Sequence, residues 1–240
     1  MEYLKKILKQ VPGMRPASRF VRNQREVLAL RRKTVEEIFT EICHRNKWGA
    51  KESVSGTGSD LLQTKAVRSA LPVIWHDFAI HTMLDIPCGD FHWMKHVDLG
   101  EIDYIGADIV ADLIERNRQY ETSKIHFRKL NLIEDKLPRV DMIFCRDCLV
   151  HMSFKDAFTA LQNICAAATG YLLTTTFTSR ENNHEIATGQ WRELNLEIAP
   201  FSFPPPLRII NEECSEGEAY KDKSLGLWKI SDIRECLIRR

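Results

Sequence analysis

The stretch Met83-Leu84-Asp85-Ile86-Pro87-Cys88-Gly89-Asp90 joins a short apolar segment to a tight turn that carries two acids. The apolar run at 83–86 is typical of a buried strand, and Pro87 and Gly89 favour an abrupt turn after it. Because Gly89 has no side chain, the backbone at this point can approach a ligand closely. The stretch therefore predicts a buried strand that ends at a ligand-binding turn.

Strand and helix patterns alternate after this turn, with short links between them. We predict strands over 104–109, 125–130, 140–145 and 171–177, and helices over 91–97, 111–120 and 154–168. Alternation of this kind is typical of an α/β fold with a parallel, doubly wound sheet. The segment 178–206 follows the last of these strands, and we expect it to serve as an active-site lid or substrate loop.

Helical patterns dominate the first part of the chain. We predict a short basic amphipathic helix over 1–11, one long helix over 20–47, and a helix over about 60–80 with Asp60 and Gln63 at capping-box-like spacing. Residues 1–33 hold ten lysines and arginines against two glutamates. We therefore divide the chain into a basic helical extension over 1–50 and a ligand-binding domain over 51–240.

The bulk composition excludes several classes of protein. The net charge of +1 gives no general case for nucleic-acid binding, so a nucleic-acid partner is not expected. No apolar run approaches the roughly 20 residues of a membrane span. The seven cysteines are scattered and follow no secretory signal, which favours reduced thiols and a cytoplasmic protein. Cys145 and Cys148 have zinc-like spacing, but no second pair follows, so no metal site is expected.

Acid or amide side chains follow three successive predicted strands. Asp85 ends the first strand, Asp108 ends the second, and Asn131-Leu132 follows the third. In a doubly wound sheet, ligands bind at the carboxyl ends of the strands. A carboxylate at Asp108 can accept hydrogen bonds from both ribose hydroxyls of an adenosine. The Asn131 oxygen can accept from an adenine amino group while Leu132 packs on the ring.

The turn itself separates two adenosine-containing cofactors. A nicotinamide dinucleotide requires a Gly-x-Gly-x-x-Gly turn that makes room for its pyrophosphate. Here the turn has only Gly89, and Asp90 would repel a pyrophosphate. S-adenosylmethionine has no phosphate and carries an ammonium and a sulfonium, so Asp85 and Asp90 suit it electrostatically. A nucleotide-dependent oxidoreductase or epimerase is therefore the weaker alternative.

Four motifs in this order resemble those of class I S-adenosylmethionine-dependent methyltransferases: residues 83–90, 104–109, 130–132 and 140–147. The resemblance implies a Rossmann-like, doubly wound, mostly parallel sheet of seven strands, closed by an antiparallel hairpin over 207–210 and 227–230. The segments 48–64 and 87–93 also resemble uncharacterised bacterial small-molecule methyltransferases associated with surface-polysaccharide genes. The cofactor implied is S-adenosylmethionine, and the cofactor-binding residues implied are Asp85, Pro87, Cys88, Gly89, Asp108, Ile109, Asn131, Leu132 and Arg146.

Two residues after the fourth predicted strand are candidates for proton transfer. If the loop there continues into a helix, the four-residue spacing of Asp147 and His151 places both on one face. His151 titrates near neutrality, so we expect it to be the general base and Asp147 to orient it. The function expected is methyl transfer to a small polar acceptor, favouring a hydroxyl such as that of a sugar or glycan precursor.

Other functions are compatible with the same motifs. The basic N-terminus could dock an RNA or protein substrate of a macromolecular methyltransferase. Pro87, which replaces the first glycine of the family's loop, would also suit a non-catalytic binding module. The sequence leaves the acceptor and the oligomeric state open.

Overall fold

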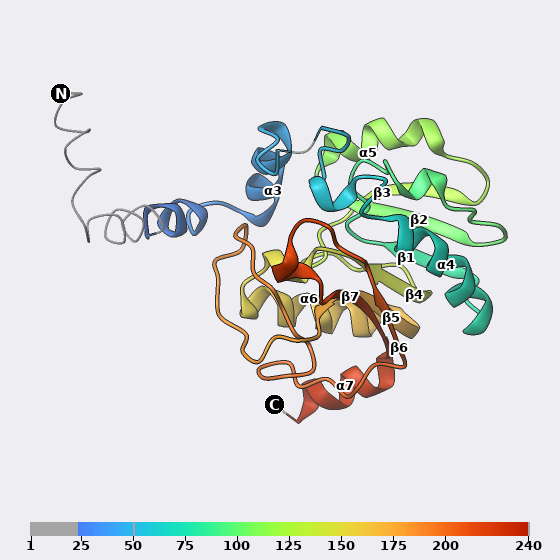
Figure 1. Ribbon diagram of the computed structural model, residues 1–240. Helices are drawn as coiled ribbons and strands as arrows, with labels where there is room; N and C mark the ends of the chain where they lie inside the picture. The colour runs from blue at the N-terminus through green and yellow to red at the C-terminus, as the bar shows by residue number, and fades with distance from the viewer. Residues whose placement is uncertain (1–23, 50, 240) are drawn as a thin grey trace.

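A single seven-stranded sheet organises the computed structural model, which describes residues 24–49 and 51–239 (Figure 1). The strand order is β3-β2-β1-β4-β5-β7-β6. Strands β1 to β5 are parallel, and β7 pairs antiparallel with both β5 and β6. The parallel, doubly wound sheet and the closing hairpin expected from the sequence are therefore confirmed. The helix predicted over 1–11 lies outside the described residues.

The strands begin and end close to where the sequence places them. Their bounds are β1 Thr82–Asp85, β2 Asp103–Asp108, β3 Ile125–Lys129, β4 Val140–Cys145, β5 Ala168–Phe177, β6 Arg208–Asn211 and β7 Lys223–Lys229. The central strand β1 pairs Asp85 with Gly106 of β2 and with Phe144 of β4. The order reverses at β1, so the carboxyl ends of β1, β2 and β4 meet at the switch point where such sheets bind ligands.

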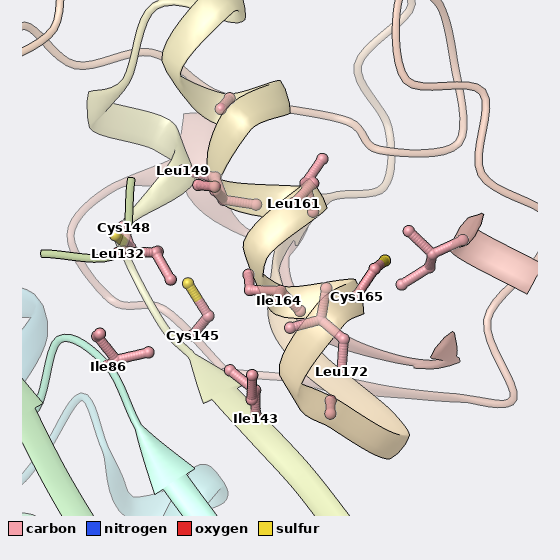
Figure 2. Packing of buried hydrophobic residues seen from close by; sticks show 14 of the residues in the cluster. Ile86, Leu132, Ile143, Cys145, Cys148, Leu149, Leu161, Ile164, Cys165 and Leu172 are labelled. Carbon is pink, nitrogen blue, oxygen red and sulfur yellow. The ribbon is translucent and has the colours of Figure 1, made fainter. Parts of the chain in front are cut away.

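Helices cover both faces of this sheet. They are α4 Lys65–Asp77, α5 Ala111–Asn117, α6 Phe154–Ala167 and α7 Ile230–Ile238, whereas α3 Val35–His44 lies beside the carboxyl ends of the strands. Successive strand residues point to opposite faces. Ile143 and Leu172 therefore pack with Leu161 and Ile164 of α6 (Figure 2), whereas Met142 packs on the α4 side. No helix in the described ranges is long and apolar enough to cross a membrane.

The single long helix predicted over 20–47 is wrong. Residues 24–30 are helical, a turn follows at 31–33, and α3 starts afresh at Val35. Thr34 causes the new start, because its hydroxyl accepts from Glu37 N (3.2 Å) while the Glu37 carboxylate accepts from Thr34 N (2.8 Å). This reciprocal pair is a capping box, which starts a new helix after Thr34. The apolar residues before and after Thr34 nevertheless keep one continuous helical spacing, which is why the sequence suggested a single helix.

Two other helix predictions also fail at their starts. The helix predicted over 60–80 begins only at Lys65, and its N-cap Thr64 makes no side-chain cap. Gln63 binds Ser215 instead, through its amide nitrogen to Oγ (2.7 Å) and its oxygen from Ser215 N (3.1 Å). The helix predicted over 91–97 is a single 3₁₀ turn at Met94–His96, following Phe91 in the left-handed region (φ 56°).

Candidate cofactor and acceptor site

A cavity lies at the carboxyl ends of β1, β2 and β4. The structure brings together around it all the residues that the sequence nominated for cofactor binding and proton transfer. These are Asp85, Pro87, Cys88, Gly89, Asp108, Ile109, Asn131, Leu132, Arg146, Asp147 and His151. We call this space the first cavity.

The turn after β1 forms the floor of the first cavity. Gly89 has φ 56°, and a Cβ placed on it would collide with the Ser55 hydroxyl, so any other residue would be strained here and would displace Ser55. Asp90 accepts hydrogen bonds from Ser53 Oγ (2.9 Å) and Val54 N (3.0 Å). The acid that the sequence suggested as a partner for a cation therefore also anchors the segment 53–55 across the turn.

Two carboxylates are buried beside this turn. Asp108 accepts from Gly89 N (3.1 Å) and Val110 N (2.9 Å), and Asp85 accepts from the Tyr104 hydroxyl (2.6 Å). Burial raises the pKa of Asp85 to about 7 and that of Asp108 to about 6. Within the described chain neither acid has a cation within ion-pair distance. A ligand that brings hydroxyl donors or positive charge would relieve this desolvation.

Apolar side chains form the other walls of the first cavity. Leu132 lies where the sequence predicts it, whereas the Asn131 oxygen already accepts from Ile133 N (2.9 Å). The sequence analysis missed the contribution of α3, which lines the cavity through Val35, Phe39 and Cys43. The signal was present, because Phe39 belongs to the helical periodicity of 27–42. The periodicity does not say which partner the helix covers.

A network of four charges, of which Asp147 alone is partly exposed, closes one side of the cavity. Arg146 donates to Glu212 through Nη2 (2.7 Å) and Nε (3.2 Å), and also to the Gly58 carbonyl (2.7 Å). Lys223 Nζ lies 2.7 Å from Asp147 Oδ2 and 3.4 Å from Glu212 Oε2. The two cations balance the two anions. Arg146 therefore borders the cofactor space as part of an ion-pair network, and local sequence patterns did not predict that Glu212, just after β6, and Lys223, on β7, belong to it.

This network makes Asp147 a poor base. Burial raises its pKa, but the positive charges of Lys223 and Arg146 outweigh burial and hold the pKa well below its usual range. Asp147 also has φ 51°, and only a 3₁₀ turn at Leu149–His151 follows it. Helix α6 begins later, with Ser153 as its N-cap. The prediction that Asp147 and His151 share one helical face is wrong, because the left-handed residue interrupts the helix.

His151 is oriented by a backbone group instead of by Asp147. Its Nδ1 lies 3.0 Å from the Gln190 carbonyl oxygen. Because a carbonyl can only accept, Nδ1 carries the proton and Nε2 keeps a lone pair. Burial lowers the pKa of the imidazole below its ordinary value, so it is neutral at pH 7. The ring packs against Trp48, with centroids 5.1 Å apart.

The segment 178–206 is braced against this histidine. Gly189 N donates to the His151 carbonyl (2.8 Å), Arg192 N to the Val150 carbonyl (3.0 Å), and Ser153 N to Thr188 Oγ1 (2.9 Å). These hydrogen bonds fix the backbone that presents the Gln190 carbonyl to the imidazole. The segment expected to be a lid or substrate loop thus supports the candidate base.

A second cavity adjoins the first. The two share Trp48, Ser55, Asp147 and His151 in their linings. The second cavity is otherwise lined by aromatic rings, by the turn 56–58 and by groups from the β6–β7 connection and β7. These other lining residues are Gly56, Thr57, Gly58, Phe177, Trp191, Cys214, Glu216, Tyr220 and Lys223.

The fold and the two joined cavities define a Rossmann-like α/β protein with a ligand site at the sheet's switch point. No family model and no curated protein matches the chain. Solved structures do match. One is 1,6-didemethyltoxoflavin-N1-methyltransferase from Burkholderia thailandensis, with its substrate and S-adenosylhomocysteine bound (TM-score 0.60, 16% identity, 85% of this chain and 89% of that chain).

Two further structures agree in fold. N-methyltransferase NodS from Bradyrhizobium japonicum, in complex with S-adenosylhomocysteine, has a TM-score of 0.59 and 13% identity over 79% of this chain and 96% of that chain. The mitomycin 7-O-methyltransferase MmcR has a TM-score of 0.55 and 16% identity over 73% of this chain and 55% of that chain. The chain therefore has the fold of class I S-adenosylmethionine-dependent methyltransferases, as the sequence motifs predicted.

Proposed function

We propose that this protein transfers a methyl group from S-adenosylmethionine to a hydroxyl of a small polar acceptor. The observation that carries the proposal is the position of His151, a neutral imidazole with an unprotonated Nε2, in the lining shared by both cavities. One cavity has the acids and apolar walls that suit the cofactor, and the other is open for an acceptor.

The residues of the first cavity fit the cofactor. Asp108, at the end of β2, keeps lone pairs for the ribose hydroxyls in addition to its two backbone donors. Asp85 is a buried carboxylate that suits a nearby positive charge, and Leu132 offers an apolar face for adenine. Helix α3, which belongs to the extension proposed over 1–50, also lines this space.

Held by Asp108 and Leu132, S-adenosylmethionine would supply a methyl group on a positively charged sulfur, whose bond to the methyl carbon would break, with the electron pair left on sulfur, as the acceptor oxygen bonds to that carbon. An oxygen acceptor must also lose its proton, and His151 Nε2 takes it. The Gln190 carbonyl then stabilises the imidazolium through Nδ1–H, and the Asp147 carboxylate in the same lining adds a favourable negative charge. Orientation between the two cavities supplies the remaining acceleration.

Titration calorimetry tests the cofactor assignment without knowledge of the acceptor. We expect S-adenosylmethionine and S-adenosylhomocysteine to bind with one site per chain and NAD not to bind. NAD binding without S-adenosylhomocysteine binding would favour the oxidoreductase alternative. Binding of neither would favour a non-catalytic module.

A further inference from the structure

We propose that the second cavity is the acceptor site and that it selects an uncharged, polyhydroxylated ring, which is the chemistry of a neutral glycoside. This inference rests on the proposed methyl transfer, because it places the acceptor opposite a cofactor in the first cavity. It adds the location of the acceptor, its charge and the residues that select it.

The shared wall places an acceptor within reach of the base. His151 and Asp147 line both cavities, so a ring in the second cavity can present one hydroxyl at their junction. The Trp48 ring lies over the His151 ring at a centroid distance of 5.1 Å and also lines both cavities. The junction is thus an imidazole backed by an indole.

One side of the second cavity is aromatic. The Trp191 ring lies 5.4 Å from the Tyr220 ring at 88°, and 6.1 Å from the Phe177 ring at 82°. Trp191 nevertheless remains 41% exposed, an unusual state for a large ring that already has two aromatic neighbours. A partly exposed indole at a cavity edge offers an apolar surface on which the C–H face of a saturated ring can pack.

The polar side chains of the same lining offer donors and acceptors for several hydroxyls. Glu216 contributes a carboxylate, and the hydroxyls of Ser55 and Thr57 can both donate and accept. Thr57 Oγ1 donates to Glu216, and the Gln63–Ser215 pair ties the same two segments together. The polar side is therefore held in place by contacts between loops, as a site for vicinal hydroxyls requires.

The charges of the lining argue against an anionic acceptor. Among the described residues, Lys223 is the one lysine or arginine in the lining of the second cavity. Its ammonium already binds Asp147 (2.7 Å) and Glu212 (3.4 Å). Glu216 has no cation within ion-pair distance in the described chain. Two carboxylates against one occupied ammonium leave the lining net negative. A phosphate, carboxylate or nucleotide-linked group there would meet repulsion and find no free cation among the described residues of the lining.

Ligand-observed NMR on the full chain, saturated with S-adenosylhomocysteine, tests this assignment. The probes are a panel of neutral methyl glycopyranosides and the corresponding sugar 6-phosphates. We expect neutral glycosides to bind and the phosphates to bind at least about tenfold more weakly, as like-charge repulsion predicts. Trp191→Ala should abolish glycoside binding and leave S-adenosylhomocysteine affinity unchanged, since Trp191 lines only the second cavity. Leu207→Ala, an exposed apolar position away from both cavities, should change neither.

A second pair of variants tests whether the negative charge of Glu216 excludes phosphorylated sugars. Glu216→Gln should narrow the difference between neutral and phosphorylated sugars, whereas Glu218→Gln, at an exposed neighbouring position, should not. The proposal is overturned if no methyl glycoside of the panel binds, if the phosphates bind more tightly, or if Trp191→Ala leaves glycoside binding intact. Failure of S-adenosylhomocysteine to bind at the outset would instead count against the proposed function.

Discussion

Replacing Asp108 by asparagine should weaken cofactor binding and stabilise the empty protein at the same time. Asp108 is 5% exposed, and burial raises its pKa from 3.8 to about 6. A folded-state pKa above the unfolded value means that ionisation costs stability, fully so above pH 6. The shift of about two pKa units corresponds to about 3 kcal/mol.

Asparagine removes this cost but offers one oxygen for two backbone donors, Gly89 N and Val110 N. The loss of one hydrogen bond costs about 1 kcal/mol of stability, so the free energy of unfolding rises by a net amount of about 2 kcal/mol. In a domain of this size, such a gain raises the melting temperature by roughly 4–8 °C. Loss of the charge-assisted bonds to the ribose hydroxyls should weaken S-adenosylhomocysteine binding by about 3 kcal/mol, or roughly 100-fold.

Calorimetry and thermal unfolding at pH 7.5 measure both effects, and Asp103→Asn, an exposed acid at the start of the same strand, is the matched control. The stability gain should fade as the pH falls from 6 toward 4, because Asp108 of the wild type is then protonated as well. An affinity for S-adenosylhomocysteine within about threefold of wild type would refute the ribose assignment, since hydrogen bonds to an ionised carboxylate contribute more binding energy than a threefold change represents. A joint fall in stability and affinity would refute the burial argument.

Three other predictions follow from the site. ¹⁵N NMR should show His151 as the Nδ1–H tautomer, neutral at pH 7, and an Nε2–H tautomer would exclude it as the base. Gly89→Ala should weaken S-adenosylhomocysteine binding and stability by about 1–3 kcal/mol; Gly100→Ala has a similar φ but open space around it, so an equal effect would contradict the steric reasoning. Lys223→Met should lower the free energy of unfolding by about 1–3 kcal/mol at pH 7, since it removes the ammonium from buried Glu212 and partly exposed Asp147, which keep Arg146 as their cation. Denaturant titration measures this loss, and a cost under about 1 kcal/mol would contradict it.

The sequence predicted those parts of the site that local patterns encode. Asp85, Gly89 and Asp108 stand directly after apolar strand segments, and parallel strands bring their carboxyl ends to one edge. The periodicity of strands and the chemistry of turns act over a few residues. A single sequence is therefore sufficient to place these groups together.

Contacts between distant segments were not predictable in this way. Arg146 meets Glu212 across 66 residues, and the Thr57–Glu216 contact joins segments 159 residues apart. The partner of His151 is the Gln190 carbonyl, a backbone group that every residue type carries. The second cavity depends on all of these contacts. The sequence accordingly indicated a cofactor site and a substrate loop over 178–206, which contributes Trp191 to the second cavity, but not the distant residues that meet Trp191 there.

A structure of the protein with S-adenosylhomocysteine bound is the most direct measurement of the central claim. We predict the ribose hydroxyls on Asp108, adenine beside Leu132, and the sulfur at the junction of the two cavities, facing His151. A sulfur directed away from the second cavity, or a ligand outside the first cavity, would contradict the account.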